Sequence, residues 1–233
     1  MKQTPEPVGV FRRFLTKSEQ PQFLGTIRQY SGEIAKRDHA VCQLMIGGGT
    51  RVGETLKASV GDAVAALESS YLFIPKEHRK GEACDLSVLV TLSIRTALLD
   101  LLSLREGAEM DEPLIVSRNS KGRGWKPMTV RAFEMRVAHW AKLAGLPDGV
   151  SPHWFRHTHA KNIVRSSEAK DPLRVAQLSL GQKSRRSTEV YTQLDREELE
   201  EALKQTDSAL HAKPRMRMAQ LRREYEGRVG ACA

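Results

Sequence analysis

SPHWFRHTHAKNIV, residues 151–164, is the most informative stretch of this sequence. Ser151 suits the N-cap of a helix because its hydroxyl can accept a hydrogen bond from a free backbone N–H of the first turn. Pro152 suits the first turn itself, where its missing N–H would have had no partner within the helix. The stretch therefore predicts a helix that carries three histidines and Arg156.

The histidines of this helix raise the question of a zinc site. His153 and His157 are four residues apart, a spacing that can place two imidazoles on one metal ion. The metalloprotease pattern needs a Glu directly after the first His, but Trp154 stands there, and Arg156 would place a positive charge beside the metal. We therefore expect no metal site here, His159 included, and no cofactor for the protein.

The charge balance favours a polyanionic partner. The 233 residues carry a net charge of +9, and their 40% hydrophobic and 28% charged fractions are ordinary for a globular protein. Lys and Arg release condensed counterions when they meet phosphates, so a surplus of this size favours nucleic acid as the partner. A basic surface that binds nothing is the alternative.

Cysteine usage and hydropathy predict a cytoplasmic protein with no membrane segment. The three cysteines are scattered and form no CxxC pair, which argues against a disulfide framework. No run approaches the roughly 18 consecutive apolar residues that span a bilayer. The N-terminal residues lack the apolar core of a signal peptide.

Hydrophobic patterning predicts a fold that is mainly α with a small antiparallel β-sheet (α+β). The apolar runs YLFIP and CDLSVLV flank a charged turn and predict a β-hairpin over residues 71–88. Gly47–Gly49 should end the second helix and form a close-packed turn, because a phosphate-binding loop would need a following Lys-Ser or Lys-Thr pair. Besides the helix from Ser151, helices are expected at about residues 22–30, 34–46, 51–59, 89–104, 130–146, 172–180 and 196–203.

Four short motifs carry the chemistry of the chain. They are GTRVGE at residues 49–54, HWFRH at 153–157, LGQ at 180–182, and EVYTQ, which contains Tyr191. Each is weak alone, because a lone Arg is usually a solvated surface charge and a lone Tyr is usually half-buried packing. Their order and spacing together make them specific.

This set resembles the tyrosine recombinase (phage integrase) family. The family pattern is an Arg in a GxRxxE turn, a Lys in the following β-hairpin, then HxxRH, LGH and a Tyr nine residues beyond the last His. The resemblance covers roughly residues 14–195, most of the chain, and implies the fold of a tyrosine recombinase catalytic domain. The matching residues are Arg51, Glu54, His153, Arg156, His157 and Tyr191, and Gln182 stands at the position of the last His.

The resemblance implies a metal-free enzyme that cleaves and rejoins DNA. Tyr191 would be the nucleophile and form a 3′-phosphotyrosyl intermediate, which conserves the energy of the broken bond. Arg51 and Arg156 would hold the phosphoryl oxygens, since a guanidinium stays charged and binds phosphate with two parallel hydrogen bonds. His153 would act as general acid and base. Glu54 and His157 would orient these groups.

Two details depart from the family pattern or stay open. Gln182 stands where the family usually has His or Trp, and it can donate a hydrogen bond but cannot transfer a proton, so we expect a reduced rate. The Lys that protonates the leaving 5′ oxygen is either Lys80 or Lys76. Alignment of the Gly-containing turn favours Lys80, which we prefer, whereas counting forward from Arg51 favours Lys76.

A second basic segment is a candidate DNA contact. SRNSKGRGWKPMT follows an extended piece at residues 113–116 and surrounds Trp125 with cations and glycines. Lys121, Arg123 and Lys126 would contact DNA there, and a simply solvated loop is an equally good interpretation.

The resemblance also predicts the organisation of the chain. We expect a flexible arm at residues 1–13, a catalytic domain at 14–205 and a basic tail at 206–233, a stand-alone layout similar to the fimbrial phase-switch recombinases. The expected partners are double-stranded DNA and further copies of the chain, as a homo-oligomer (tetramer) on DNA. The alternatives are a non-catalytic DNA-binding protein that retains the fold and, third, a type IB topoisomerase.

Overall fold

The structure is a computed structural model that describes residues 13–79, 84–118, 124–182 and 203–206 together with Thr188 and Tyr191. The chain divides into two compact units, Met1–Gln193 and Leu194–Ala233. Every element discussed below belongs to the first unit. The helices are α1 (Glu19–Arg28), α2 (Glu33–Gly48), α3 (Val52–Thr55), α4 (Val60–Ser69), α5 (Leu92–Ser103), α6 (Val130–Leu143), α7 (Pro152–Ser166) and α8 (Pro172–Ser179), with a 3-10 turn at Lys76–His78.

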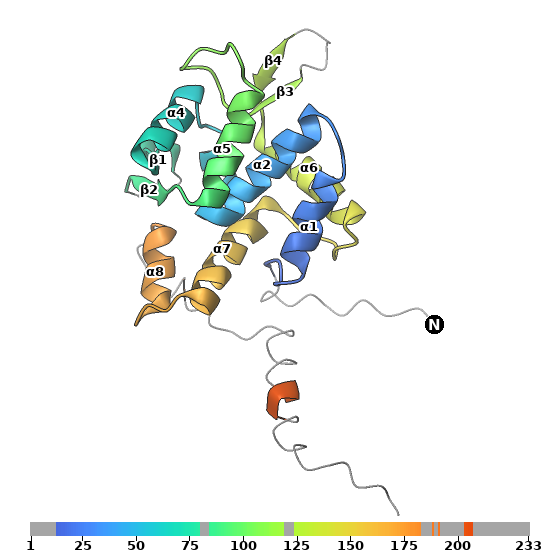
Figure 1. The fold of residues 1–233 in the computed structure, drawn as a ribbon, viewed down its shortest axis with the longest axis vertical. Coiled ribbons are helices and arrows are strands. Elements are labelled where there is room, and N and C mark those ends of the chain that lie inside the picture. Colours follow the sequence, from blue (N-terminus) through green and yellow to red (C-terminus); the bar gives the residue numbers. More distant parts are fainter. Residues whose placement is uncertain are drawn as a thin grey trace, which may run out of the picture. The chain divides into compact units, whose positions relative to one another are not determined.

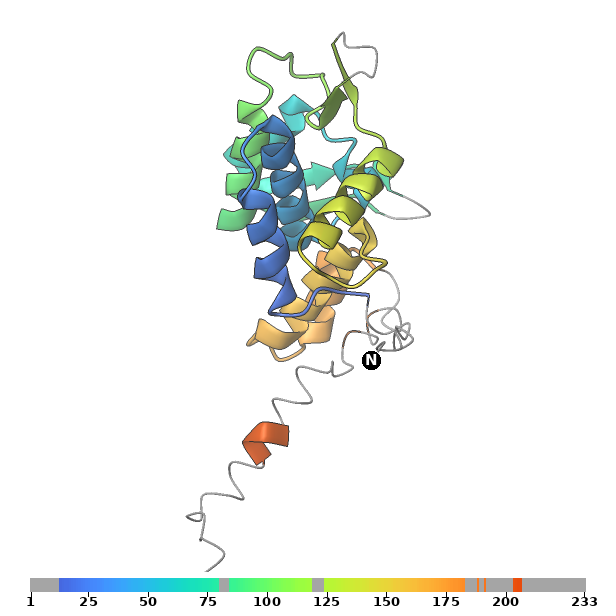
Figure 2. The ribbon, with the colours of Figure 1, turned by 90° about the vertical axis from the view of Figure 1, so that its right-hand side faces the viewer.

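Helix α2 is the centre of the first unit. It packs against α1, α5 and α7, and five of its six residues from Ala40 to Met45 are buried, Gln43 being the exception. Figure 1 shows α2 between α5 and α1, and Figure 2 shows α1 and α6 side by side. The helix is buried on most of its circumference because neighbours cover it on several sides. It ends at Gly48, and Gly49 follows in the left-handed conformation with φ 64°, as the glycine run predicts.

A buried carboxylate ties other elements to α2. Asp38 is fully buried and accepts hydrogen bonds from Arg37, from Arg136 Nε at 2.6 Å and from Trp140 Nε1 at 2.8 Å. Arg37 also donates to the backbone oxygen of Val116 at 2.9 Å. Because a buried carboxylate is stable only when its oxygens are satisfied, this cluster fixes α6 and the strand at Val116 on α2.

Helix α4 is not among the elements predicted above. Ser59 and Asp62 form a reciprocal capping box, with Asp62 N–H donating to Ser59 Oγ at 3.0 Å and Ser59 N–H donating to Asp62 Oδ2 at 2.9 Å. The usual signature of this motif has Glu or Gln at the third position, so an Asp there is easily overlooked. The reciprocal pair Thr16 and Glu19 caps the start of α1 in the same way.

Two small antiparallel sheets complete the fold. Strands β1 (Tyr71–Ile74) and β2 (Leu86–Leu89) pair with Tyr71 opposite Leu89, which confirms the predicted hairpin. Strands β3 (Val116–Arg118) and β4 (Trp125–Pro127) form a second hairpin. Only the first of this pair was expected to be extended, because the basic, Gly-rich sequence around Trp125 is typical of a loop.

The two hairpins lie at different places on the unit. The β1–β2 hairpin is beside α4, whereas β3 and β4 lie at the end of the unit opposite α7 and α8 (Figures 1 and 2). Among the described residues, no helix combines the length and apolar character needed to cross a membrane.

Candidate active site

The first candidate residues lie at the turn that joins α2 to α3. Arg51 is the N-cap residue of α3, and its backbone N–H donates to Glu54 Oε2 at 2.8 Å. The guanidinium of Arg51 donates to the other carboxylate oxygen, Oε1, at 2.9 Å. Although burial opposes it, these hydrogen bonds hold the pKa of Glu54 below its ordinary value. The partly exposed guanidinium of Arg51 is thereby held in one orientation, and it makes no other side-chain hydrogen bond to a described residue.

Arg156 is held in the interior beside this turn. Its side chain donates to the backbone oxygen of Gly49 at 2.7 Å and to that of Leu180 at 2.9 Å, and the residue is 3% exposed. Burial, together with the nearby charge of Arg51, lowers the pKa of Arg156 to about 10. The guanidinium therefore stays charged at neutral pH and joins α7 to two separate turns.

The predicted histidines and tyrosine form a row. The rings of His153 and His157 have centroids 4.4 Å apart, and those of His157 and Tyr191 are 5.3 Å apart. Burial and the neighbouring Arg156 lower the pKa of His153, and burial with the neighbouring His153 lowers the pKa of His157 to about 4. Both imidazoles are therefore neutral at pH 7 and able to accept a proton. His157, which was expected only to orient other groups, is the histidine that contacts Tyr191.

Tyr191 is buried among apolar residues of α7 and α8. It is 5% exposed and packs in a cluster with Ala160, Ala176 and Leu180. Burial raises the pKa of Tyr191, while the charge of Arg156 and a hydrogen bond from the Gln182 side chain act in the opposite direction. The phenol is therefore protonated at rest, and the groups that favour its ionised form are already beside it.

Gln182 is positioned by contacts on both sides. Its backbone N–H donates to Gln177 O at 3.0 Å, and its side-chain Oε1 accepts from Thr188 Oγ1 at 2.9 Å. Because the hydrogen bond with the Gln182 side chain lowers the pKa of Tyr191, and a phenolate can only accept, the amide NH2 of Gln182 is the group that donates to Tyr191. An amide at this position therefore holds the tyrosine oxygen without exchanging a proton.

The comparisons with known proteins identify the family of the chain. The sequence pattern of the phage integrase family matches residues 13–198. The chain belongs to the phage integrase family. "Tyrosine recombinase XerC" of Neisseria meningitidis is 32% identical over 162 residues, which are 70% of this chain and 48% of that protein. XerC of Chromobacterium violaceum is 31% identical over 163 residues, 70% of this chain and 50% of that protein. This integrase-family chain thus spans about half the length of the curated relatives it matches.

Solved structures show the same fold. The crystal structure of XerA recombinase has a TM-score of 0.66 and 24% identity, and the match covers 91% of this chain and 68% of that one. The XerH site-specific recombinase bound to its palindromic difH substrate has a TM-score of 0.61 and 22% identity, with 82% and 52% covered. The predicted fold class, mainly α with small antiparallel sheets, is confirmed as that of the tyrosine recombinase catalytic domain.

The structure leaves the choice of lysine in this integrase-family domain open. Lys80 lies outside the described residues. Lys76 lies on the 3-10 turn after β1, is exposed, and its backbone N–H donates to Asp85 Oδ1 at 2.8 Å. Both lysines therefore stay predictions.

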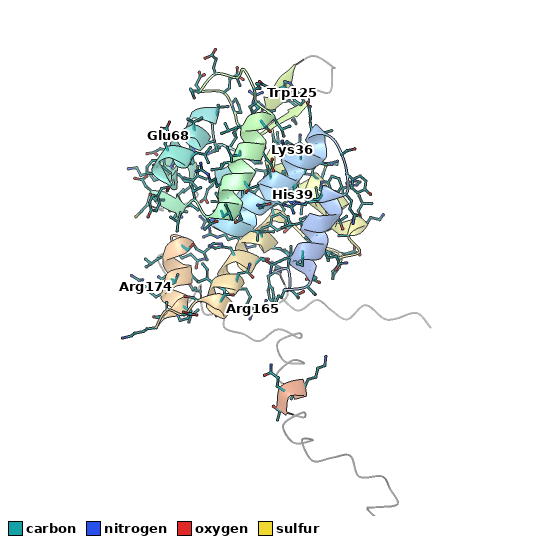
Figure 3. All side chains as sticks on the ribbon, viewed as in Figure 1. Lys36, His39, Glu68, Trp125, Arg165 and Arg174 are labelled. Carbon is teal, nitrogen blue, oxygen red and sulfur yellow. The ribbon has the colours of Figure 1, made fainter. Side chains whose placement is uncertain are left out.

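The predicted DNA-contact segment lies apart from the catalytic cluster. Lys126 is exposed on β4, and Trp125 beside it is 50% exposed (labelled in Figure 3). Lys121 and Arg123 lie outside the described residues. Because β4 is at the end of the unit opposite α7, Trp125 and Lys126 are not part of the site around Tyr191 (Figures 1 and 3).

Two functional candidates were missed because the sequence does not distinguish buried cations from solvated ones. Arg79 lies in the charged run after β1, yet its side chain is only 1% exposed and its Nε donates to Glu54 at 3.4 Å. Lys161 of α7 is buried, and its Nζ donates to the backbone oxygen of Tyr191 at 3.5 Å. Only the packing of distant segments reveals these partners.

His159 is a third residue whose role was not predicted. Its Nδ1 lies 3.1 Å from the backbone oxygen of Ile46 and its Nε2 lies 2.7 Å from Ser179 Oγ. A neutral ring that donates from Nδ1 and accepts at Nε2 satisfies both contacts. No cluster of three or more potential metal-ligating side chains occurs among the described residues. His159 therefore links α2, α7 and α8.

Replacement of Gly49 by Ala is expected to destabilise the protein strongly. At φ +64° a Cβ would lie 2.4 Å from His159 Cδ2 and 2.9 Å from a methyl of Leu180. The left-handed backbone costs an L-residue roughly 1–2 kcal/mol and overpacking roughly 1–3 kcal/mol, so we expect a loss of about 2–5 kcal/mol in the free energy of unfolding. Urea denaturation measures it. Gly53→Ala is the control, since a Cβ there has nothing within 4 Å. An equal loss of unfolding free energy in both variants would show that the close approach at Gly49 is not the cause.

The burial of His159 predicts that the free energy of unfolding depends on pH. Burial lowers the pKa of His159 to about 4 against the attraction of the Ile46 oxygen, so the unfolded chain binds more protons than the folded one between pH 4 and 6.5. Unfolding then takes up a proton. The contribution of the neutral His159 to the free energy of unfolding is therefore complete above pH 6.5 and is lost as the pH falls towards 4. A pKa difference of this size corresponds to at most about 3 kcal/mol.

The measurement is urea denaturation at pH 7 and at pH 4.5 for the wild-type protein and for His159→Asn. Other groups titrate equally in both proteins, so the difference between the two losses isolates His159. We expect the wild-type protein to lose more stability than the variant on acidification. Equal losses would show that His159 is not held neutral in the folded state.

Proposed function

We propose that this integrase-family domain cleaves and rejoins strands of double-stranded DNA through a 3′-phosphotyrosyl intermediate at Tyr191. One observation carries the proposal. The turn after α2, helix α7 and Tyr191 are far apart in the sequence, yet Arg51, Arg156, His157 and Tyr191 lie together in one place. The XerC relatives are named tyrosine recombinases, and the XerH structure contains its difH DNA substrate.

The two arginines supply the charge that phosphoryl transfer needs. The charges of Arg51 and Arg156 act on each other and on Tyr191, so a phosphate beside the tyrosine would lie within their field. A phosphodiester gains negative charge on its oxygens during attack, and fixed cations stabilise that charge without reorganisation. Glu54 keeps Arg51 in place through two hydrogen bonds.

The proton of Tyr191 has a nearby acceptor. The tyrosine needs to lose its proton as its oxygen attacks phosphorus, and a neutral imidazole can accept that proton. His157 contacts the ring of Tyr191 and His153 follows it in the row, so we propose that this pair carries the proton away. We further propose that Lys80 or, alternatively, Lys76 protonates the leaving 5′ oxygen. The 5′ hydroxyl of the cleaved strand or of a partner strand then attacks the phosphotyrosine and releases Tyr191.

Recombination by this chemistry needs several active sites on one DNA complex. We therefore propose that the protein works as a tetramer on DNA, in the cytoplasm. Lys121, Arg123 and Lys126 would contact the DNA backbone away from the cleaved phosphate. The net charge of +9 supports such contacts because each phosphate neutralised by Lys or Arg releases counterions.

A suicide DNA substrate tests the proposal. The duplex carries a nick near the cleavage site, so the cleaved fragment diffuses away and the protein stays attached. A pool of random duplexes together with DNA that flanks the gene serves as substrate, because the natural site is not defined. We expect a protein–DNA adduct that survives denaturant and forms with EDTA present, since the guanidinium groups provide the positive charge.

The same assay separates the two candidate functions. A defined footprint on one DNA without any adduct would contradict the enzyme proposal and would favour a DNA-binding protein that retains the fold. Gln182 in place of the family's His is the observation that favours this second function, because an amide cannot transfer a proton.

A further inference from the structure

Arg79 connects parts of the site that are far apart in the sequence. Its Nε donates to Glu54 Oε1 at 3.4 Å, and one terminal nitrogen lies 3.3 Å from the backbone oxygen of Leu180. The other terminal nitrogen donates to the backbone oxygen of Cys84 on the far side of the hairpin tip. A single guanidinium therefore joins the turn at α3, both sides of the β1–β2 hairpin tip and the turn after α8.

The contacts of Arg79 overlap with those of the proposed phosphate-binding residues. Glu54 Oε1 accepts from both Arg79 and Arg51, and the Leu180 oxygen accepts from both Arg79 and Arg156. A shift of Arg79 would therefore disturb Glu54, which holds Arg51, and the Leu180 oxygen, which holds Arg156. The shared acceptors form a continuous chain from Arg51 to Arg156.

Burial excludes a direct contact between Arg79 and DNA. The side chain is 1% exposed, so its N–H groups are directed at protein acceptors and not at solvent. A buried guanidinium needs such partners, because an unpaired buried charge is very costly. The fit is close on the Leu180 side, where a Cβ on Gly181 would lie 2.6 Å from a terminal nitrogen of Arg79.

We infer that Arg79 is a positioning residue of the recombination site, which holds the Leu180–Gln182 turn against Glu54 and thereby places Gln182 and Tyr191 beside the two phosphate-binding arginines. The inference rests on the proposed function for its catalytic consequence, but the positioning itself does not depend on activity. Gln182 follows the clamped turn directly and its side chain donates to Tyr191.

The shape of the guanidinium is essential to this role. Its planar fork reaches Glu54, Leu180 and Cys84 in three directions, whereas the ammonium of Lys is a single point at the end of a flexible chain. Arg79→Lys keeps the charge but cannot keep the three contacts. If only the charge mattered, lysine would replace arginine without loss.

The experiment compares Arg79→Gln and Arg79→Lys with the wild-type chain. Hydrogen exchange of the folded protein is measured by mass spectrometry in the peptides that cover residues 177–191. The backbone N–H of Gln182 donates to the backbone oxygen of Gln177 and should exchange slowly in the wild-type protein. We expect exchange in these peptides to rise in both variants, while peptides from α2 and α5 stay unchanged.

Adduct formation on the suicide substrate is the second readout. A displacement of about 1 Å in reacting groups costs roughly 10²-fold, so we expect the rate of adduct formation to fall about 10- to 100-fold in both variants at unchanged DNA affinity. Arg37→Gln is the matched control, because Arg37 is also a buried arginine that pairs with a carboxylate, Asp38. By helix rise, Arg37 lies about 18 Å along α2 from Gly49. Arg37→Gln should lower stability without loosening residues 177–191.

Each outcome separates the inference from the proposed function. Unchanged hydrogen exchange at residues 177–191 in both Arg79 variants would overturn the inference. The same local increase in exchange in Arg37→Gln, or a wild-type rate of adduct formation in Arg79→Lys, would also overturn it. Local loosening in a chain whose wild-type form makes no adduct would retain the positioning role and contradict the proposed enzyme.

Discussion

Tyr191→Phe is expected to abolish the covalent adduct and to leave DNA binding intact. The substitution removes one oxygen from a side chain that packs in an apolar cluster, so the fold should tolerate it. Removal of an enzyme's nucleophile typically costs on the order of 10⁶ in rate. The measurement is the amount of denaturant-stable adduct over time, with binding followed in parallel by a mobility shift.

The matched control for this prediction is Tyr71→Phe. Tyr71 is an exposed tyrosine on β1, and the same atom is removed from it at a place outside the proposed site. We expect a wild-type rate from this variant. Adduct in Tyr191→Phe at a rate within tenfold of the wild-type protein would show that another residue is the nucleophile.

Arg156→Lys is expected to lose both activity and stability. Lysine retains the charge but cannot donate to Gly49 and Leu180 and also keep a fork for phosphate. Loss of one preorganised donor to developing charge costs roughly 10²–10³ in rate. A buried carbonyl left without a partner adds roughly 1–3 kcal/mol of destabilisation.

Single-turnover adduct formation and urea denaturation measure the two effects. Arg174→Lys on α8 provides the control, because Arg174 is exposed and donates to Gln177 (labelled in Figure 3). We expect little change in that variant. A wild-type rate in Arg156→Lys would contradict the assignment of Arg156 to the phosphoryl oxygens.

The parts of the site with local sequence signals could be predicted. Arg51 and Glu54 are three residues apart, and their contact is a capping interaction within one turn. His153, Arg156 and His157 share one helix whose start is marked by Ser151 and Pro152. Such features depend on neighbours in sequence, so a linear motif contains them.

The parts that depend on packing between distant segments could not be predicted. Arg79 looks like any cation of a charged turn until Leu180, 101 residues later, is placed beside it. The role of His159 could not be predicted because Ile46 and Ser179, which satisfy its ring, lie on other helices. The direct contact of His157 with Tyr191 likewise arises from the placement of Tyr191 against α7, 34 residues from His157 in the sequence.

Tyr191 is expected to become joined to a DNA 3′ phosphate. This linkage is tested by mass spectrometry of the trapped adduct after digestion of the protein with trypsin and of the DNA with nuclease. We expect a nucleotide attached through a 3′ phosphate to the peptide that contains Tyr191. A nucleotide on any other residue, or a 5′ linkage on Tyr191, would contradict it.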